Sequence, residues 1–346
     1  MDKTFGIGSL SENNLKSKIQ NLKWAGFVAI LILLVVCVGI VEAQQQKKVP
    51  RIGLLTLTPP SSLAPRIKAF REALRQLGYV EGQNMTIEYR HAEGKGDRLS
   101  GLVAELVREK VDIILTMGPG AREAKRATSV VPIVFWFSGD PVEAGLIQSL
   151  ARPGGNVTGM TFLAYELVGK RLELLKEAVP WVSRVAVLAN PAHPGEQREL
   201  RETQTTARAL GTTLQYVQVR DTADFDGAFD AMIKEKANAL LVFPDGFTNA
   251  HREQIAAFAT KQRLPSMFGW KEYVEAGGLM AYGPDLNESV KRIAVYIDKI
   301  LKGTKPADLP VEQPTKFEFV INLKTAKQIG LTIPPNVLAR ADRVIR

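Results

Sequence analysis

The sequence predicts an α/β fold with two doubly wound lobes joined by a hinge and preceded by a signal peptide. Three observations lead to this prediction. Short apolar runs alternate with amphipathic stretches of helical periodicity, which is typical of β–α–β units around a parallel sheet. The alternation pauses near residues 153–165 and then starts again. The length of 346 residues exceeds what one average core requires and suits two lobes.

The N-terminal segment has the pattern of a secretory signal. Lysines precede an apolar run at residues 27–41, which at fifteen residues is shorter than a typical membrane span. Small or β-branched residues end at Ala43, so cleavage is predicted there and the signal peptide covers residues 1–43. An uncleaved membrane anchor is the alternative. Because Cys37 is the single cysteine, the mature chain is expected to have no disulfide or thiolate site.

The first lobe is expected to contain four strands that alternate with helices. In "APRIKAFREALRQLG", Ile67, Phe70 and Leu74 share one helical face and Gly78 supplies a C-terminal stop. The expected strands cover residues 51–58, 85–90, 111–117 and 131–137. The expected helices cover residues 64–78, 97–110 and 118–128, with a fourth that starts at Pro141.

The second lobe repeats this alternation. Its expected strands cover residues 184–190, 213–219, 238–243, 264–269 and 278–282. Its expected helices cover residues 166–180, 195–210, 224–236 and 249–262. We therefore expect a second parallel sheet of similar size to the first.

The C-terminal part adds a helix at 287–303, a proline-rich connector at 304–314 and a strand at 317–322. Glycine and proline mark three candidate crossings between the lobes. The crossings are expected near 153–165, 282–284 and 311–318. The resulting assignment is 48–160 plus 283–325 for lobe one, 161–282 for lobe two and 326–346 for a C-terminal tail. The alternative is two independent domains in tandem.

The net charge of +9 does not by itself indicate a nucleic acid partner. Acidic residues are interspersed among the basic ones, as in "KAFREALRQ" and "RLELLKEA", and no run of five or six like charges occurs. The sequence therefore predicts a mixed, solvated surface that binds no nucleic acid.

The motifs of the common enzyme classes are missing. The three histidines, His91, His193 and His251, lack a partner at metal-ligand spacing, and each is expected to be a surface or loop residue. "GPGARE" is a weak match to a dinucleotide fingerprint because Glu123 occupies the third glycine position. There is no phosphate loop and no G-x-S-x-G elbow. We therefore predict a protein that is not an enzyme and that binds no metal and no cofactor. An exported α/β enzyme is kept as an alternative.

Polar turns follow most of the predicted strands. Ligands of open parallel sheets bind outside the carboxyl ends of the strands, and the unpaired amides at helix starts attract anions. Turn residues also serve as plain punctuation, so a binding role requires that these turns converge. The candidate ligand-binding residues are Thr58, Pro59, Gly118, Pro119, Ser138, Gly139, Asp140, Asn190, Asp245, Trp270 and Tyr282.

These turns also indicate a ligand class. They contain no lysine or arginine, so a zwitterionic or neutral ligand with an aromatic or apolar part is favoured over phosphate or sulfate. Helix-start amides would take a carboxylate, Asp245 an amine and Trp270 a flat apolar portion. Asp140 is expected mainly to cap the helix at Pro141, while Ser138 meets the ligand. The alternative is that Trp270 packs between helices and Asp245 caps the next helix.

Three long stretches carry a family resemblance. They are "VPIVFWFSGDPVEAGLIQSLARPGGNVTGMTFLAYELVGKRLELLKEAVPWVSRVAVLANP", "WKEYVEAGGLMAYGPDL" and "LKGTKPADLPVEQPTKFEFVINLKTAKQIGLTIPPNVLARADRVI". They resemble the ABC transporter substrate-binding protein family that includes tryptophan- and tyrosine-binding members. The resemblance covers about residues 50–345 and implies a type I periplasmic binding protein fold with a three-segment hinge.

The resemblance implies a receptor rather than an enzyme. It would capture a small-molecule ligand between the lobes and present the closed form to a cognate ABC permease and its ATPase. The location would be periplasmic or extracytoplasmic, with membrane contact only through the permease or an uncleaved signal anchor. A periplasmic sensor subunit of a signalling system is the alternative. The resemblance does not fix the ligand, so a lipid, an aromatic amino acid or another small molecule stays open.

Overall fold

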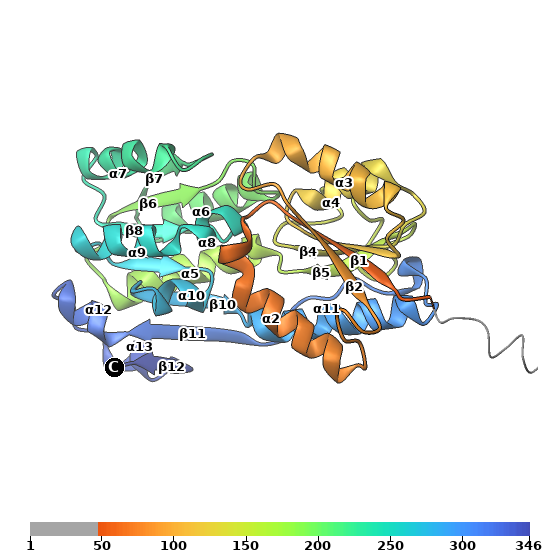
Figure 1. The fold of residues 1–346 in the computed structure, drawn as a ribbon. Coiled ribbons are helices and arrows are strands. Elements are labelled where there is room, and N and C mark those ends of the chain that lie inside the picture. Colours follow the sequence, from red (N-terminus) through yellow and green to blue (C-terminus); the bar gives the residue numbers. More distant parts are fainter. Residues whose placement is uncertain (1–47) are drawn as a thin grey trace, which may run out of the picture. The chain divides into compact units, whose positions relative to one another are not determined.

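The structure is a computed structural model and describes residues 48–346. The expected signal peptide at 1–43, its alternative as an anchor, and Cys37 lie outside the described residues. Residues 50–346 form one compact unit (Figure 1). Within the described part of the chain, no helix is both long and apolar enough to cross a membrane.

The first lobe is built on a five-stranded parallel sheet with the order β2-β1-β3-β4-β5. Its strands are β1 (Arg51–Thr56), β2 (Thr86–His91), β3 (Ile113–Met117), β4 (Ile133–Phe137) and β5 (Val157–Thr161). The first four were expected, whereas β5 lies in the segment expected to be a pause. A glycine interrupts its apolar pattern for a structural reason, because a Cβ on Gly159 would lie 2.1 Å from the Phe135 carbonyl oxygen.

Helices cover both faces of this sheet. The helices α3 (Leu99–Arg108) and α4 (Gly120–Ala127) lie on one face, after a short turn η1 (Gly96–Arg98), and α2 (Pro60–Gln76) lies on the other (Figure 1). Alternation along β4 sends Phe135 and Phe137 toward α3 and α4 and sends Trp136 to the opposite face.

The helix expected from Pro141 does not form. Residues 141–145 make turns, and the amides of Leu146 and Ile147 both bond to the Pro141 carbonyl oxygen. Gly145 has a φ of +67°, and a right-handed helix cannot continue through a residue in this left-handed conformation. The Asp140 side chain accepts bonds from the amides of Val142 (2.9 Å) and Glu143 (3.2 Å), so it caps a turn instead of a helix.

The second lobe is built on a seven-stranded sheet with the order β12-β11-β10-β9-β8-β6-β7. Its strands are β6 (Arg184–Ala189), β7 (Thr213–Gln218), β8 (Ala239–Val242), β9 (Ser266–Phe268), β10 (Met280–Pro284), β11 (Phe317–Asn322) and β12 (Arg343–Ile345). Its helices are α5 (Ala164–Ala178), α6 (Glu196–Ala209), α7 (Asp224–Lys234), α8 (Gly246–Ala250), α9 (Arg252–Lys261), α10 (Lys271–Glu275), α12 (Leu323–Gln328) and α13 (Pro335–Leu338). The prediction of two α/β lobes is confirmed.

The C-terminal assignment needs a correction. Helix α11 (Leu286–Leu301) packs on α2 of the first lobe, as expected. Strand β11, however, pairs antiparallel with β10 and so belongs to the second sheet. Residues 326–346 are also part of this lobe rather than a tail, because the buried Ala326, Ile329 and Val337 join its core. A strand that follows a long connector can join either sheet, and its own residues do not say which.

The chain therefore passes three times between the two sheets. The passages lie between β5 and α5, between β10 and α11, and between η2 (Pro306–Asp308) and β11. The third passage runs beside the end of β5, because the Glu312 amide donates to the Gly159 carbonyl and the Thr161 amide donates to the Glu312 carbonyl.

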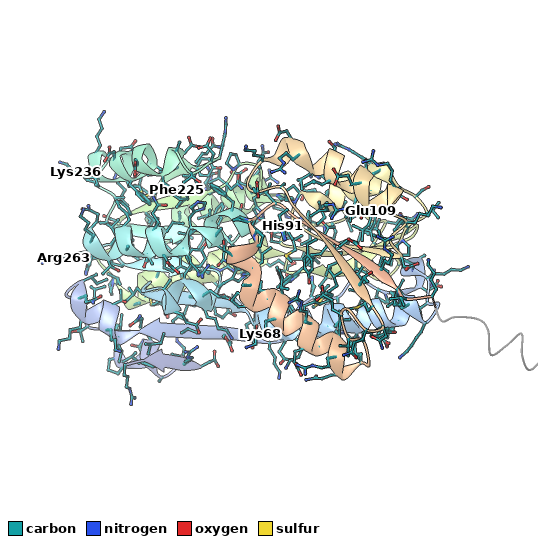
Figure 2. The ribbon with its side chains drawn as sticks, in the orientation of Figure 1. Lys68, His91, Glu109, Phe225, Lys236 and Arg263 are labelled. Carbon is teal, nitrogen blue, oxygen red and sulfur yellow. The ribbon has the colours of Figure 1, made fainter. Side chains whose placement is uncertain are left out.

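The outer surface carries charges of both signs. Lys68, Lys236 and Arg263 are exposed, and Lys68 lies away from the other two, which are at the end of the second lobe (Figure 2). This distribution is that of a solvated surface in which basic residues do not gather into one stripe.

Candidate functional site

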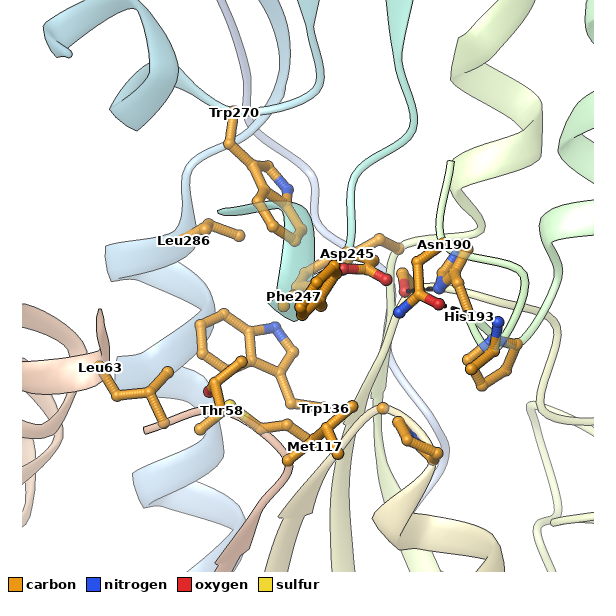
Figure 3. Close-up of a pocket in the computed structure, with 18 of the residues that line it drawn as sticks. Thr58, Leu63, Met117, Trp136, Asn190, His193, Asp245, Phe247, Trp270 and Leu286 are labelled. Atoms are coloured by element: carbon orange, nitrogen blue, oxygen red, sulfur yellow. Dashed lines mark hydrogen bonds between the residues drawn. The ribbon is translucent and has the colours of Figure 1, made fainter. Parts of the chain in front are cut away.

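A cavity of about 60 Å³ lies between the two lobes (Figure 3). Turns after the strands supply most of its walls, and the ends of β3 and β4 and the N-terminal parts of α2, α8 and α11 supply the rest. The lining residues are Leu57, Thr58, Leu63, Arg66, Met117, Gly118, Pro119, Trp136, Ser138, Phe162, Asn190, Ala192, His193, Pro194, Asp245, Gly246, Phe247, Trp270 and Leu286. Both lobes contribute, so movement of one lobe relative to the other changes the size of the cavity.

Most of the candidate residues from the sequence line this cavity. The seven that do so are Thr58, Gly118, Pro119, Ser138, Asn190, Asp245 and Trp270. The turns converge because the carboxyl ends of parallel strands meet at one edge of each sheet.

The other four candidates lie elsewhere. Pro59 is the residue before the first turn of α2. Gly139 is buried against the backbone of Pro194. Tyr282 accepts a bond from Arg171 Nε through its carbonyl oxygen (2.8 Å). Asp140 faces an outer groove, where Arg198 Nη1 lies 3.0 Å from its Oδ2.

A buried polar chain crosses from one lobe to the other at the polar end of the cavity. The Ser138 hydroxyl of the first lobe lies 3.2 Å from His193 Nδ1 of the second. His193 Nε2 lies 2.9 Å from Glu199 Oε1. Burial by itself would lower the pKa of His193, but the negative charge and hydrogen bond of Glu199 outweigh it, so the pKa is raised. His193 thus links the Ser138 turn to helix α6.

His193 lies in the loop before α6, in agreement with the expectation of a surface or loop residue, but it is buried. Only 6% of His193 is exposed, and it lines the cavity. Its partner Glu199 is six residues further along the chain, a spacing that corresponds to no standard metal or catalytic motif. Sequence spacing therefore gave no sign of this pair.

Asp245 has two roles at once. Its Oδ1 accepts a hydrogen bond from the Thr248 amide (2.8 Å) and so caps α8. Capping of the next helix was the alternative role expected for this residue. It also lines the cavity beside Asn190 (Figure 3). Burial raises the pKa of Asp245, against the opposing effects of His193 and of hydrogen bonds that include one from Asn190. A buried carboxyl group beside amide and imidazole groups can receive a donor from a ligand.

Aromatic rings form the apolar part of the cavity. Trp136, Phe247 and Trp270 lie around the same space (Figure 3). Trp136 meets Phe162 edge to face, with ring centroids 5.6 Å apart. These rings come from both lobes and can enclose a flat apolar group.

Arg66 is a cavity residue that the sequence reading missed. Its guanidinium carbon lies 5.5 Å from the centroid of Trp136 and 5.2 Å from that of Trp270. Burial lowers the pKa of Arg66, but an arginine stays protonated at neutral pH. The predicted binding residues lay in the turns after strands, whereas Arg66 lies in the second turn of α2. Arg66 lies three residues after Leu63 and four before Phe70, so helical periodicity places it on the buried face of α2. This spacing is the sequence feature that could have identified Arg66 as a cavity residue.

Ion pairs join the lobes at the outer rim of the cavity. Arg198 of α6 contacts Asp140 at 3.0 Å and Glu143 at 3.4 Å. Its guanidinium also lies 3.7 Å from the centroid of the Tyr165 ring. Burial and the charge of Asp140 raise the pKa of Tyr165 to about 12. The lobes are thus in contact both inside the cavity and at its rim.

The sequence matches the family model of "ABC transporter substrate binding protein" over residues 51–345. A tyrosine-binding protein from Clostridioides difficile is 26% identical over 286 residues, which are 82% of this chain and 82% of that protein. In residues 48–346, no group of three or more His, Cys, Asp or Glu is placed to hold a metal ion.

Two solved structures have the same fold. A conserved domain protein from Vibrio cholerae is 29% identical with a TM-score of 0.80, and the match covers 86% of this chain and all of that one (100%). An ABC domain in complex with L-Trp from Streptococcus pneumonia is 27% identical with a TM-score of 0.77, and the match covers 85% of this chain and 100% of that one.

Proposed function

This chain belongs to the ABC transporter substrate-binding protein family, and on that premise we propose that its inter-lobe cavity captures a small amphipathic solute that carries an aromatic or apolar ring and a charged polar end. The protein is the solute-binding component of an uptake system and is not an enzyme. The observation that carries the proposed ligand class is the division of the cavity into a ring of aromatic side chains and a cluster of buried polar groups.

The aromatic part suits a flat group. Trp136 comes from the first lobe and Trp270 from the second, so a flat group in the cavity can contact both lobes at once. The polar part contains Asp245, Asn190 and Ser138, which can receive an amine and other hydrogen-bonding groups. An aromatic amino acid has both parts. The relatives are consistent with this class, since one is described as tyrosine-binding and another was solved with L-Trp.

The size of the cavity supports lobe movement as part of binding. Its volume of about 60 Å³ is well below the roughly 300–1,000 Å³ of sites that hold drug-sized ligands. A solute with an aromatic ring therefore enters only when the lobes or the lining side chains move apart. Three chain passages between the sheets provide the segments about which such a movement takes place.

We further propose that the protein is exported and docks on a membrane permease. Members of this family typically lie outside the cytoplasm, and the N-terminal apolar run would direct export to the periplasm or an equivalent compartment. The closed, ligand-loaded form would then be presented to a cognate permease and its ATPase.

A thermal-shift panel with purified mature protein tests the ligand class. The panel contains aromatic and aliphatic amino acids, aromatic acids, sugars and phosphate. A ligand present at a hundred times its Kd should raise the free energy of unfolding by about 2.7 kcal/mol. We expect this from aromatic amino acids or aromatic acids. Stabilisation by sugars or phosphate alone would overturn the ligand class.

Two tryptophan variants locate the binding site. Trp270→Ala removes a ring from the cavity wall and should abolish the stabilisation by ligand. Trp181→Ala is the matched control, because Trp181 is 56% exposed and lies outside the cavity lining. Equal loss of ligand response in both variants would show that the effect is not specific to the cavity.

A further inference from the structure

We propose that Arg66 and the indole N–H of Trp136 form the receptor for a carboxylate group on the ligand. This inference deepens the proposed function and rests on it, because it assigns one end of the ligand to one end of the cavity. It also moves the carboxylate site away from the helix-start amides that the sequence suggested.

Two buried hydrogen-bond donors in the cavity wall have no acceptor among the described residues. Arg66 Nη2 and Trp136 Nε1 are each fully enclosed and make no hydrogen bond to any residue in the described part of the chain. Both side chains line the same cavity. A buried N–H group without a partner is destabilising, and more so when the group is charged, so a ligand that supplies an acceptor gains binding energy there.

The positive charge of Arg66 is buried and contacts no anionic side chain in the described residues. Arg66 is 8% exposed and forms no ion pair within residues 48–346. The charge of Glu272 acts on Arg66, but the two side chains make no ion-pair contact. A buried cation that contacts no anion is destabilising, because its loss of hydration is only partly compensated. An anionic group in the cavity reduces this penalty by direct contact with the guanidinium.

Two aromatic rings hold the Arg66 guanidinium in place. The Trp136 and Trp270 rings lie 5.5 Å and 5.2 Å from the Arg66 guanidinium carbon and hold it between the lobes. A guanidinium that stacks on rings keeps its N–H bonds in its own plane, where a planar carboxylate can accept two of them. Phosphate is a weaker fit, because the walls next to the guanidinium are aromatic.

The groups that can bind an amine lie across the cavity from Arg66 and Trp136. Asp245 and Asn190 come from the second lobe, whereas Arg66 and Trp136 come from the first. A ligand with a carboxylate and an amine would contact one charged end on each lobe. The pair of charges therefore selects α-amino acids and related zwitterions over amines, sugars and inorganic anions.

The test compares ligands that differ only in the carboxylate. Isothermal titration calorimetry is carried out with L-tryptophan, tryptamine and L-tryptophan methyl ester on the wild-type protein. We expect L-tryptophan to bind at least about 10-fold more tightly than either analogue, because a hydrogen bond to a charged group contributes about 1.5–3 kcal/mol. Equal binding of L-tryptophan and tryptamine overturns the inference while the proposed ring-binding function stands.

Variants then assign the effect to the two residues. Arg66→Met should weaken L-tryptophan binding by about 10- to 100-fold and abolish its advantage over tryptamine. Arg66→Lys should restore part of that advantage, and Trp136→Phe should reduce it while the ring is kept. Arg75→Met is the matched control on the same helix, because the Arg75 side chain is 67% exposed and lies outside the cavity lining.

The outcomes separate this inference from the proposed function. If Arg66→Met weakens L-tryptophan and tryptamine equally, Arg66 acts only as a clamp between two rings and the inference fails. If aliphatic amino acids bind in an Arg66-dependent way and aromatic ones do not, the carboxylate receptor stands and the aromatic class falls. If no carboxylate-bearing probe binds, the inference is overturned. The apo melting temperature of each variant shows whether it is folded.

Discussion

The contact between Gly139 and Pro194 predicts that a single methyl group will hold the lobes apart. Gly139 belongs to the turn after β4, and Pro194-Gly195 precede α6 in the other lobe. A Cβ on Gly139 would lie 2.2 Å from the Pro194 carbonyl oxygen, and the shortfall from the 3.4 Å of ordinary contact is about 1.2 Å. The obstruction is backbone on both sides, so no side chain can rotate away.

We expect Gly139→Ala to weaken ligand binding and to leave the folding stability of the apo protein nearly unchanged. Overpacking of this kind costs about 1–3 kcal/mol, and only the arrangement with the lobes together bears it. The Kd for the most stabilising compound of the thermal-shift panel should therefore rise by about 5- to 150-fold. The apo protein relieves the clash by opening, so its free energy of unfolding should change by no more than about 0.5 kcal/mol.

Calorimetry and small-angle scattering measure these two consequences. The variant should have a larger radius of gyration than the wild type when each is saturated with ligand. Gly101→Ala is the control, because Gly101 is exposed on α3 and a Cβ there meets nothing within 4 Å. If Gly139→Ala binds ligand as tightly as the wild type, with an unchanged radius, the contact is not part of the ligand-bound arrangement and the reasoning is wrong.

Two further predictions concern pH and the C-terminus. The raised pKa of His193 means that its stabilising effect is complete below the unfolded value near 6.5 and is lost as pH rises through the folded value. The stability advantage of the wild type over His193→Gln should therefore shrink between pH 6 and 9 in urea unfolding, and a constant difference would refute this. Ile329→Ala should destabilise the protein by about 2–4 kcal/mol, because Ile329 is 6% exposed in the second core. A midpoint equal to that of the wild type would mean that residues 326–346 are a dispensable tail after all.

Local pattern and the convergence of strand ends explain how much of the site was predictable. Thr58, Gly118, Ser138, Asn190 and Asp245 each follow a buried strand, and the geometry of a parallel sheet brings such positions to one edge. The same reasoning included Asp140, which lies at that edge but outside the cavity, where it contacts Arg198. A turn residue can face inward or outward, and one sequence does not record which.

Arg66 and His193 show why the remaining site residues were missed. Each is polar, and polar residues on helices and in loops are usually exposed, so the usual interpretation placed them in solvent. Their burial depends on partners far away in sequence. Arg66 lies between Trp136 and Trp270, and His193 meets Ser138 from the other lobe.

The sequence by itself determined the alternation of strands and helices, the division into two lobes and the set of polar turns, because these depend on hydrophobic periodicity and local backbone preference. Only the tertiary structure decided which sheet receives β11, that the chain continues as strand β5 through the expected pause, and which side chains enclose the cavity. These features depend on contacts between residues far apart in the chain, such as β10 with β11 and Gly139 with Pro194. The free energy of such contacts is set by packing in three dimensions, which a linear pattern does not contain.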